Sequence, residues 1–337
     1  MSMQVDRAVR AFSRPYAVQD DRQAWTSFLG SYAAYLGTLA LAVWAAHLHW
    51  ALALPLIVVN AFAGVRLYVL QHDCGHHSLF VTRRMNDLAG ALLSVVTLTP
   101  YRVMQFNHNE HHAHLGNLDE RHTTEIYTMT VREWETATWS QRLLYRLYRH
   151  PLVLIPVGGF WTYLFAYRWP KNAARVGAAG VLAHNAALLA WVGLIWLLGG
   201  LTGLAVWFGT VIVAGWIGVF LVYLQHNFED TWWDRKPGLV PMKAQLKGSS
   251  ALDLGWWWDL GTGNIAYHDI HHYNPRIPSY RLRECHRALR DEFDCHIIRW
   301  PEALRSFSLR LWDEEQQRLV PFPKTPRRAP NGGLTRA

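Results

Sequence analysis

Two long stretches of this 337-residue chain contain no Asp, Glu, Lys or Arg. They run from Ser27 to Val65 and from Val176 to Phe228, which is 39 and 53 residues. A helix that crosses a membrane needs about 20 apolar residues, so each stretch has room for two crossings. The average composition hides this segregation, because the hydrophobic fraction is 51% and the mean hydropathy is −0.03. The missing charge argues against an ordinary soluble domain and predicts four membrane spans.

Several chemical signatures are also missing. The three cysteines, Cys74, Cys285 and Cys295, have no spacing typical of a zinc site or a disulfide framework, which favours reduced thiols in the cytoplasm. The N-terminus is polar and basic, unlike a cleavable signal peptide. There is no glycine fingerprint of a dinucleotide-binding fold, no cysteine run for an iron–sulfur cluster and no haem-domain signature. Any redox chemistry therefore needs an external electron donor.

Basic residues outnumber acidic ones, and the net charge is +8. The arginines are scattered instead of forming a groove, so anionic lipid headgroups fit better than nucleic acid. All Lys and Arg lie outside the two hairpin turns that join the paired spans. By the positive-inside rule, both termini and the central loop are cytoplasmic. We expect a multi-pass protein of the bacterial inner membrane, with spans near Phe28–His47, Ala51–Leu70, Val176–Leu198 and Leu201–Leu224.

Two shorter apolar runs, Leu88–Tyr101 and Pro151–Tyr167, are too short or only just long enough to span. If both crossed, residues 102–150 would lie outside, so we interpret the runs as interfacial or half-inserted helices. The expected architecture is an all-α membrane protein with four transmembrane helices in two hairpins, interfacial helices and a cytoplasmic helical cap. Its expected parts are a cytoplasmic N-terminal segment (1–27), a membrane domain (28–224) whose central cytoplasmic loop covers about 71–175, a cytoplasmic cap (225–320) and a disordered tail (321–337).

Most of the 18 histidines are bunched into three boxes. The second and third boxes have the spacing i, i+3, i+4, which places the imidazoles on one face of a helix. The first uses i, i+4, i+5 and directly follows the second predicted span. A lone His226 leaves the fourth span at the same membrane depth, which makes it a further candidate. The boxes are His72, His76 and His77; His108, His111 and His112; and His268, His271 and His272.

A single box of this kind could be a solvated helix face, but three on the same side of the membrane indicate a shared metal site. Eight or nine imidazoles exceed what one metal can hold, so two metals are expected. Imidazole suits iron, copper, nickel and zinc, and the ligand type does not choose among them. Asp73, Glu110 and Asp269 lie beside the boxes and could orient ligand rings through the second nitrogen. They could equally be exposed carboxylates that balance arginine.

These boxes resemble the HxxxH(H), HxxHH and HxxHH signatures of the membrane-bound fatty acid desaturases, in the same order and with similar gaps. The flanking text is similar to that of bacterial and plant acyl-lipid desaturases, and the similarity covers roughly residues 25–300. The wider superfamily also contains hydroxylases and ketolases. The segments that carry the resemblance are His72–Phe80 (HDCGHHSLF), Gly116–Thr130 (GNLDERHTTEIYTMT), Tyr223–Trp233 (YLQHNFEDTWW) and Gly261–Tyr280 (GTGNIAYHDIHHYNPRIPSY).

The resemblance implies two iron ions, molecular oxygen as co-substrate and two electrons per turnover. It implies that the three boxes ligate the iron, with either His76 or His77 taking part, and that His226 is an additional ligand. By analogy, Asn264 could hold a metal-bound water. The implied reaction introduces a cis double bond into an acyl chain. A methylene chain has no polar handle, so we expect a cavity walled by spans two and four and the interfacial helices to select the carbon.

The implied partners are an acyl lipid or acyl thioester, membrane lipids, and a donor such as ferredoxin or a small cytochrome with its reductase. The Arg-rich face would suit an acidic carrier, although the same arginines could simply contact anionic lipid. A hydroxylase or ketolase acting on a lipid or carotenoid is the nearest alternative. A metal transporter or sensor would need ligands along a path through the bilayer, and a zinc metalloprotease of the His-Glu-x-x-His type is excluded because that motif is absent.

Overall fold

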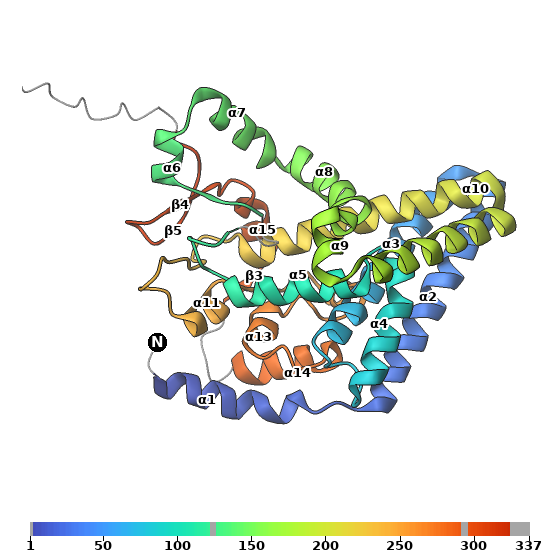
Figure 1. Ribbon diagram of the computed structural model, residues 1–337, viewed down its shortest axis with the longest axis horizontal. Coiled ribbons are helices and arrows are strands. Elements are labelled where there is room, and N and C mark those ends of the chain that lie inside the picture. The colour runs from blue at the N-terminus through green and yellow to red at the C-terminus, as the bar shows by residue number, and fades with distance from the viewer. Residues whose placement is uncertain (1–2, 122–125, 291–295, 324–337) are drawn as a thin grey trace, which may run out of the picture.

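The computed structural model describes residues 3–121, 126–290 and 296–323. Long helices gather at one end of the molecule, and short helices and strands cover the other end (Figure 1). The chain passes between these two parts repeatedly, so segments far apart in the sequence meet at their junction. The histidine boxes all lie on elements that reach this junction.

Among the described residues, three helices are long and apolar enough to cross a membrane: α2 (Asp21–Leu48), α3 (Trp50–Gly75) and α10 (Ala178–His226). The third is two helical segments joined at Gly200, whose φ of 60° and ψ of −152° are not helical. Figure 1 shows α10 doubling back at this point. A backbone of this shape is accessible to glycine because it has no Cβ.

The helix pair α2–α3 is fixed by its ends and by one buried amide. Asp20 caps α2 by accepting from the backbone N–H groups of Arg22 and Gln23, and a single extended residue, His49, separates the two helices. Within the pair, Asn60 of α3 is fully buried and donates to the backbone oxygen of Tyr35 at 2.6 Å. Side-chain hydrogen bonds of this kind hold apolar helices in register.

The segment between α3 and α10 forms several shorter helices. The apolar run at 88–101 divides between α4, which packs on α3, and the start of α5, while most of the run at 151–167 forms α8. Helix α8 crosses α10 closely, because a Cβ on Gly159 would lie 2.8 Å from the backbone of Gly215. The elements are α1 (Met3–Ser13), η1 (Arg14–Ala17), α4 (Arg83–Thr97), α5 (Tyr101–His114), α6 (Val131–Thr136), α7 (Trp139–Tyr148), α8 (Pro151–Leu164), η2 (Ala166–Arg168) and α9 (Pro170–Val176).

The segment after α10 contains strands as well as helices, so the all-α expectation was incomplete. Parallel β1–β4 pairing joins the central segment to the C-terminal hairpin, and β2 pairs with β3. Period-two patterns are not recognisable in strands of two or three residues, which is why the sequence did not indicate them. The elements are α11 (Pro241–Lys247), α12 (Trp256–Gly261), α13 (His268–Tyr273), α14 (Ser279–Arg290), α15 (Trp300–Ser306), β1 (Met129–Thr130), β2 (Ala251–Leu252), β3 (Ile297–Ile298), β4 (Leu311–Asp313) and β5 (Arg318–Val320).

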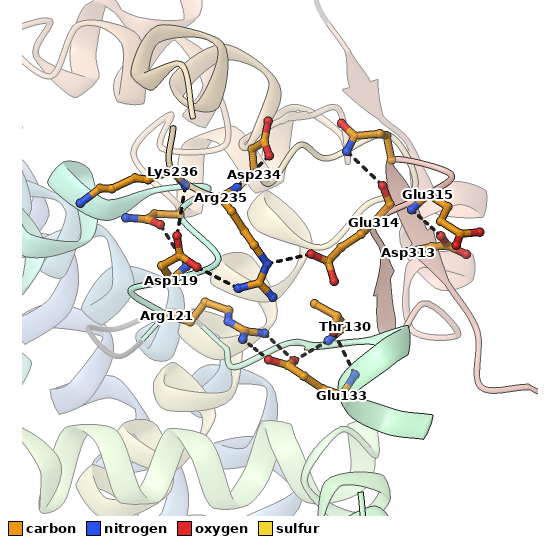
Figure 2. Close-up of polar contacts among 12 residues, drawn as sticks. Asp119, Arg121, Thr130, Glu133, Asp234, Arg235, Lys236, Asp313, Glu314 and Glu315 are labelled. Carbon is orange, nitrogen blue, oxygen red and sulfur yellow. Dashed lines mark hydrogen bonds and ion pairs between the residues drawn. The ribbon is translucent and has the colours of Figure 1, made fainter. Parts of the chain in front are cut away.

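Charged side chains tie the segment after α5 to the C-terminal part. Figure 2 shows Arg235 between Asp119 and Glu314, with nitrogen–oxygen distances of 2.8 Å to each. These groups are more than a third exposed on average, so each pair stabilises the fold by at most about 1 kcal/mol. Their importance is geometric, because they fix the loop that leaves the second histidine box.

The predicted tail begins inside the fold. The ring of Phe322 packs 4.6 Å from that of Trp134 on α6. Residues 324–337, the rest of the predicted tail, lie outside the described residues.

Candidate metal centre

Nine imidazoles converge at the junction between the long helices and the cap, and they form two groups. Within each group, one ligand nitrogen per histidine lies within 4.8 Å of all the others. Group A consists of His72, His76, His108, His112 and His271, and group B consists of His111, His226, His268 and His272.

The helix spacing explains how each box divides between the groups. On α5, His108 and His112 are four residues apart and join group A, whereas His111, about 100° around the helix from His112, joins group B. On α13 the division is reversed, because His268 and His272 join group B and His271 joins group A. One helix therefore serves two neighbouring sites, which box spacing alone did not reveal.

The Nε2 atoms face one another inside both groups. In group A, Nε2 of His112 lies 2.9 Å from that of His108 and 3.1 Å from that of His271. In group B, Nε2 of His272 lies 3.2 Å from that of His111 and 2.9 Å from that of His268. A neutral imidazole has only one N–H, so protons cannot satisfy several nitrogens that meet at one point. A cation at that point would satisfy all of them.

Burial supports the same interpretation. Among the described residues, Nε2 of His72 and Nε2 of His76 are buried and have no hydrogen-bond partner, an arrangement that is costly unless a metal or water takes their lone pairs. Burial also lowers the pKa of six of the imidazoles well below its ordinary value, and charge on neighbouring histidines lowers it further. The neutral form, which binds metal, is therefore favoured in His76, His108, His112, His268, His271 and His272.

The lone His226 at the end of α10 belongs to group B. Its Nδ1 lies 3.0 Å from the backbone oxygen of Gly248, which can only accept, so Nδ1 carries the proton. That bond fixes the ring and makes Nε2 the nitrogen that could bind a metal. The next residue, Asn227, accepts a hydrogen bond from the fully buried Arg149, whose guanidinium also donates to the backbone oxygen of Leu309 at 3.1 Å.

The structure separates the two histidines of the first box. His76 ends α3 and faces group A, whereas His77 has a φ of 53°, which turns the chain away from the helix axis. The His77 ring lies outside both groups, with Nε2 3.3 Å from Oδ1 of Asp87. This left-handed residue has no local signal in the sequence, because non-glycine residues with positive φ are uncommon.

The four polar neighbours proposed from the sequence lie in different places. A carboxylate oxygen of the buried Asp73 is 3.6 Å from Nδ1 of His72, and the other accepts from the backbone of Ser279 at 2.7 Å. Asn264 donates to the backbone oxygen of Ser279. Asp269 lies 3.3 Å from the buried His286, and the partly exposed Glu110 lies 3.9 Å from His114.

An elongated cavity leads from both groups into the bundle of long helices. Helix α3 forms one wall with Gly64, Tyr68 and His72, and the second segment of α10 forms the opposite wall from Thr210 to His226. That stretch of α10 is about 24 Å long at the helical rise of 1.5 Å per residue. These helices contain the second and fourth predicted spans, which the sequence suggested as walls, and Leu98, Tyr163 and Tyr167 line a third side. The sequence analysis did not single out Tyr68 as a cavity residue, although it lies four residues before His72 and therefore on the same face of α3.

The sequence is similar to those of several known proteins. A family model described as "Fatty acid desaturase" matches residues 48–302. The chain is 32% identical to a fatty acid desaturase of Bacillus subtilis, over 95% of this chain and 90% of that protein. It is 27% identical to the sn-1 oleoyl-lipid 12-desaturase of Anabaena variabilis, over 83% and 79% of the two chains. It is 30% identical to the sn-1 acyl-lipid omega-3 desaturase (ferredoxin) of a Synechocystis species, over 66% and 63%.

Proposed function

This chain belongs to the fatty acid desaturase family, and we propose that it introduces a cis double bond into the acyl chain of a membrane lipid at a di-iron centre. The observation that carries the proposal is the junction of a long cavity with two adjacent imidazole groups. A cavity whose walls carry mainly apolar and aromatic side chains fits a hydrocarbon chain, which gains about 0.8 kcal/mol for each methylene removed from water. The lipid substrate class is supported by the names of the cyanobacterial relatives.

The nine histidines of groups A and B would hold two iron ions, and bound iron would supply the oxidising chemistry that removes two hydrogens with molecular oxygen. The chain itself positions the substrate. His72 and His108 of group A and His111, His226 and His268 of group B line the cavity, so one stretch of chain can lie against both groups. The walls exclude water from the reacting carbons, and the depth of the cavity selects which carbons react.

The proposed topology has four crossings, with α10 contributing two that meet at Gly200. The absence of charge from 27–65 and 176–228, and the basic character of the remaining segments, support both termini and the metal centre on the cytoplasmic side of the inner membrane. The proposed parts are the segment 1–27, the membrane domain 28–224 and the cap 225–320. Electrons would come from an acidic one-electron carrier, a choice supported by the ferredoxin in the name of the Synechocystis relative.

Expression in a bacterial host that makes no unsaturated lipid of the same type tests the proposal. We expect new cis double bonds, found by mass spectrometry of the lipids as a loss of two hydrogens and located by cleavage at the double bond. A gain of one oxygen would instead identify a hydroxylase or ketolase. His111→Ala should abolish the product while membrane insertion is retained, and Asn109→Ala, exposed on the same helix, is the matched control. Equal turnover in His111→Ala and the control would contradict the proposal.

A further inference from the structure

Two short helices of the cap expose large apolar side chains on one surface. Trp256 and Leu260 of α12 are 72% and 60% exposed, and Leu304 of α15 is 65% exposed. The pairs 256/260 and 300/304 are each one helical turn apart, so each helix presents a single apolar face. We call this surface the tryptophan patch; it consists of Trp256, Trp257, Leu260, Trp300 and Leu304.

The patch is built onto the long helices. The ring of Trp257 lies 5.8 Å from that of Phe62 on α3, and the ring of Trp300 lies 6.3 Å from that of Phe220 on α10. Between them, the buried Trp258 contacts both phenylalanines at 5.5 Å. The patch therefore has a rigid aromatic base that α3 and α10 provide.

Its depth along the long helices follows from the same contacts. The Arg66 guanidinium of α3 donates to the backbone oxygen of Leu260 at 2.7 Å, which pins the end of α12. Phe62 and Arg66 lie inside the second predicted span, and Phe220 lies inside the fourth. Helices α12 and α15 thus lie alongside the cap-side ends of the second and fourth predicted spans. Their outer faces are therefore exposed to the same surroundings as the ends of those spans.

The chemistry of the surface matches a membrane interface. Tryptophan is enriched where hydrocarbon meets headgroups, because its ring is apolar and its N–H is polar. Arg299 and Arg305, next to Trp300 and Leu304 in the sequence, have side chains that are 71% and 68% exposed and lie 3.7 and 2.8 Å from carboxylate oxygens of Asp253 and Glu229. Exposed ion pairs of this kind are weak, so both arginines can also reach anionic headgroups. Trp300 donates its indole N–H to the backbone oxygen of Leu254 at 3.1 Å, which fixes the ring.

We propose that the tryptophan patch seats the cap in the lipid bilayer at the headgroup–acyl boundary, so that the cap is a membrane-anchored part and not a purely aqueous one. This inference rests on the membrane placement in the proposed function. Helix α12, which carries Trp256, Trp257 and Leu260, precedes the third histidine box by only a few residues, and Ile265, between the two, lines the cavity. Seating α12 in the bilayer therefore fixes the start of the short segment that leads to the third box.

Site-specific fluorescence on the full-length chain tests the proposal. A polarity-sensitive thiol probe is placed by Leu260→Cys, with Val59→Cys on α3 as the lipid-facing control and Glu315→Cys on the β4–β5 hairpin as the aqueous control. The labelled protein is studied in phosphatidylcholine–phosphatidylglycerol nanodiscs, and the signal of the unaltered chain, which has three native cysteines, is subtracted. Quenching is measured with nitroxide-bearing lipid and with aqueous iodide.

We expect blue-shifted emission at position 260, strong quenching by the nitroxide lipid and loss of most of the iodide quenching seen at position 315. Iodide quenching at 260 equal to that at 315 would overturn the proposal, and shielding from both quenchers would overturn it in favour of a protein partner. In either case, lipid quenching at position 59 and retained desaturation would leave the proposed function standing. Failure of lipid quenching at position 59 would instead contradict the membrane placement itself.

Discussion

Groups A and B use the same imidazole ligand but are assembled differently. Four of the five members of group A come from α3, from its C-cap residue His76 and from α5, and three of its members are only partly buried. Group B draws its four members from α5, α10 and α13, and all four are buried. Group A takes only His271 from the cap, whereas group B needs the end of α10 and two histidines of α13 to meet His111.

The difference shows how far local spacing determines a site. A spacing of four residues reliably places two rings on one side of a helix, and both His108/His112 and His268/His272 follow it. Which site the third histidine of a box reaches depends on the angles between helices. Substituting residues of one group and measuring iron binding in both can therefore show how much of each site depends on helix spacing and how much on the packing between helices.

The largest effect is expected from removing one ligand of either group. His76→Ala in group A and His268→Ala in group B should each eliminate product formation and about half of the bound iron, because the remaining imidazoles of that group leave a coordination position open. Metal analysis of the purified protein and lipid profiling measure the two quantities. Loss of all iron in both variants would show that the groups do not bind independently.

A smaller effect is expected from Asp73→Asn. The carboxylate lies beside His72 and accepts from Ser279, so the amide should preserve the shape but weaken the support of a group A ring. Partners of this type typically contribute a factor of about 10 to 100 in metal affinity. Iron titration of the metal-free protein should show that loss in one of two binding steps. An unchanged titration would mean that Asp73 serves only the fold.

Arg149→Met should weaken iron binding in group B, by less than Asp73→Asn weakens it in group A. The substitution removes the donor to the side-chain oxygen of Asn227 and to the backbone oxygen of Leu309. Each buried acceptor left without a donor costs about 1–3 kcal/mol of stability. Because Asn227 follows His226, we expect a lower melting temperature together with weaker iron binding in the group B step. Arg149→Lys should recover part of both. A fall in melting temperature with both iron steps unchanged would limit Arg149 to a structural role.

The smallest effect is expected from His77→Ala. The His77–Asp87 pair is about one-third exposed, so its loss should cost no more than about 1 kcal/mol, and both groups remain complete. Activity and iron content should stay close to those of the unaltered protein. A collapse of either one, comparable to that in His76→Ala, would reverse the assignment of the two adjacent histidines.

The sequence predicted the parts of the molecule that depend on composition and period. Long uncharged runs predicted the apolar helices, and box spacing predicted convergent imidazoles. The sequence could not decide whether His76 or His77 faces the metal centre, because that depends on the left-handed backbone conformation of His77. It also missed the exposed face of α12, since three consecutive tryptophans have no amphipathic pattern until the fold buries Trp258 and exposes its neighbours. These features depend on tertiary contacts with α3 and α10.

The proposed centre holds two iron ions, one in each imidazole group, beside one cavity. Anomalous X-ray diffraction at the iron absorption edge, from crystals of the iron-loaded protein, tests it most directly. We predict two anomalous peaks, one among the Nε2 atoms of group A and one among those of group B. A single peak, or none at these positions, would show that groups A and B do not form a di-iron centre.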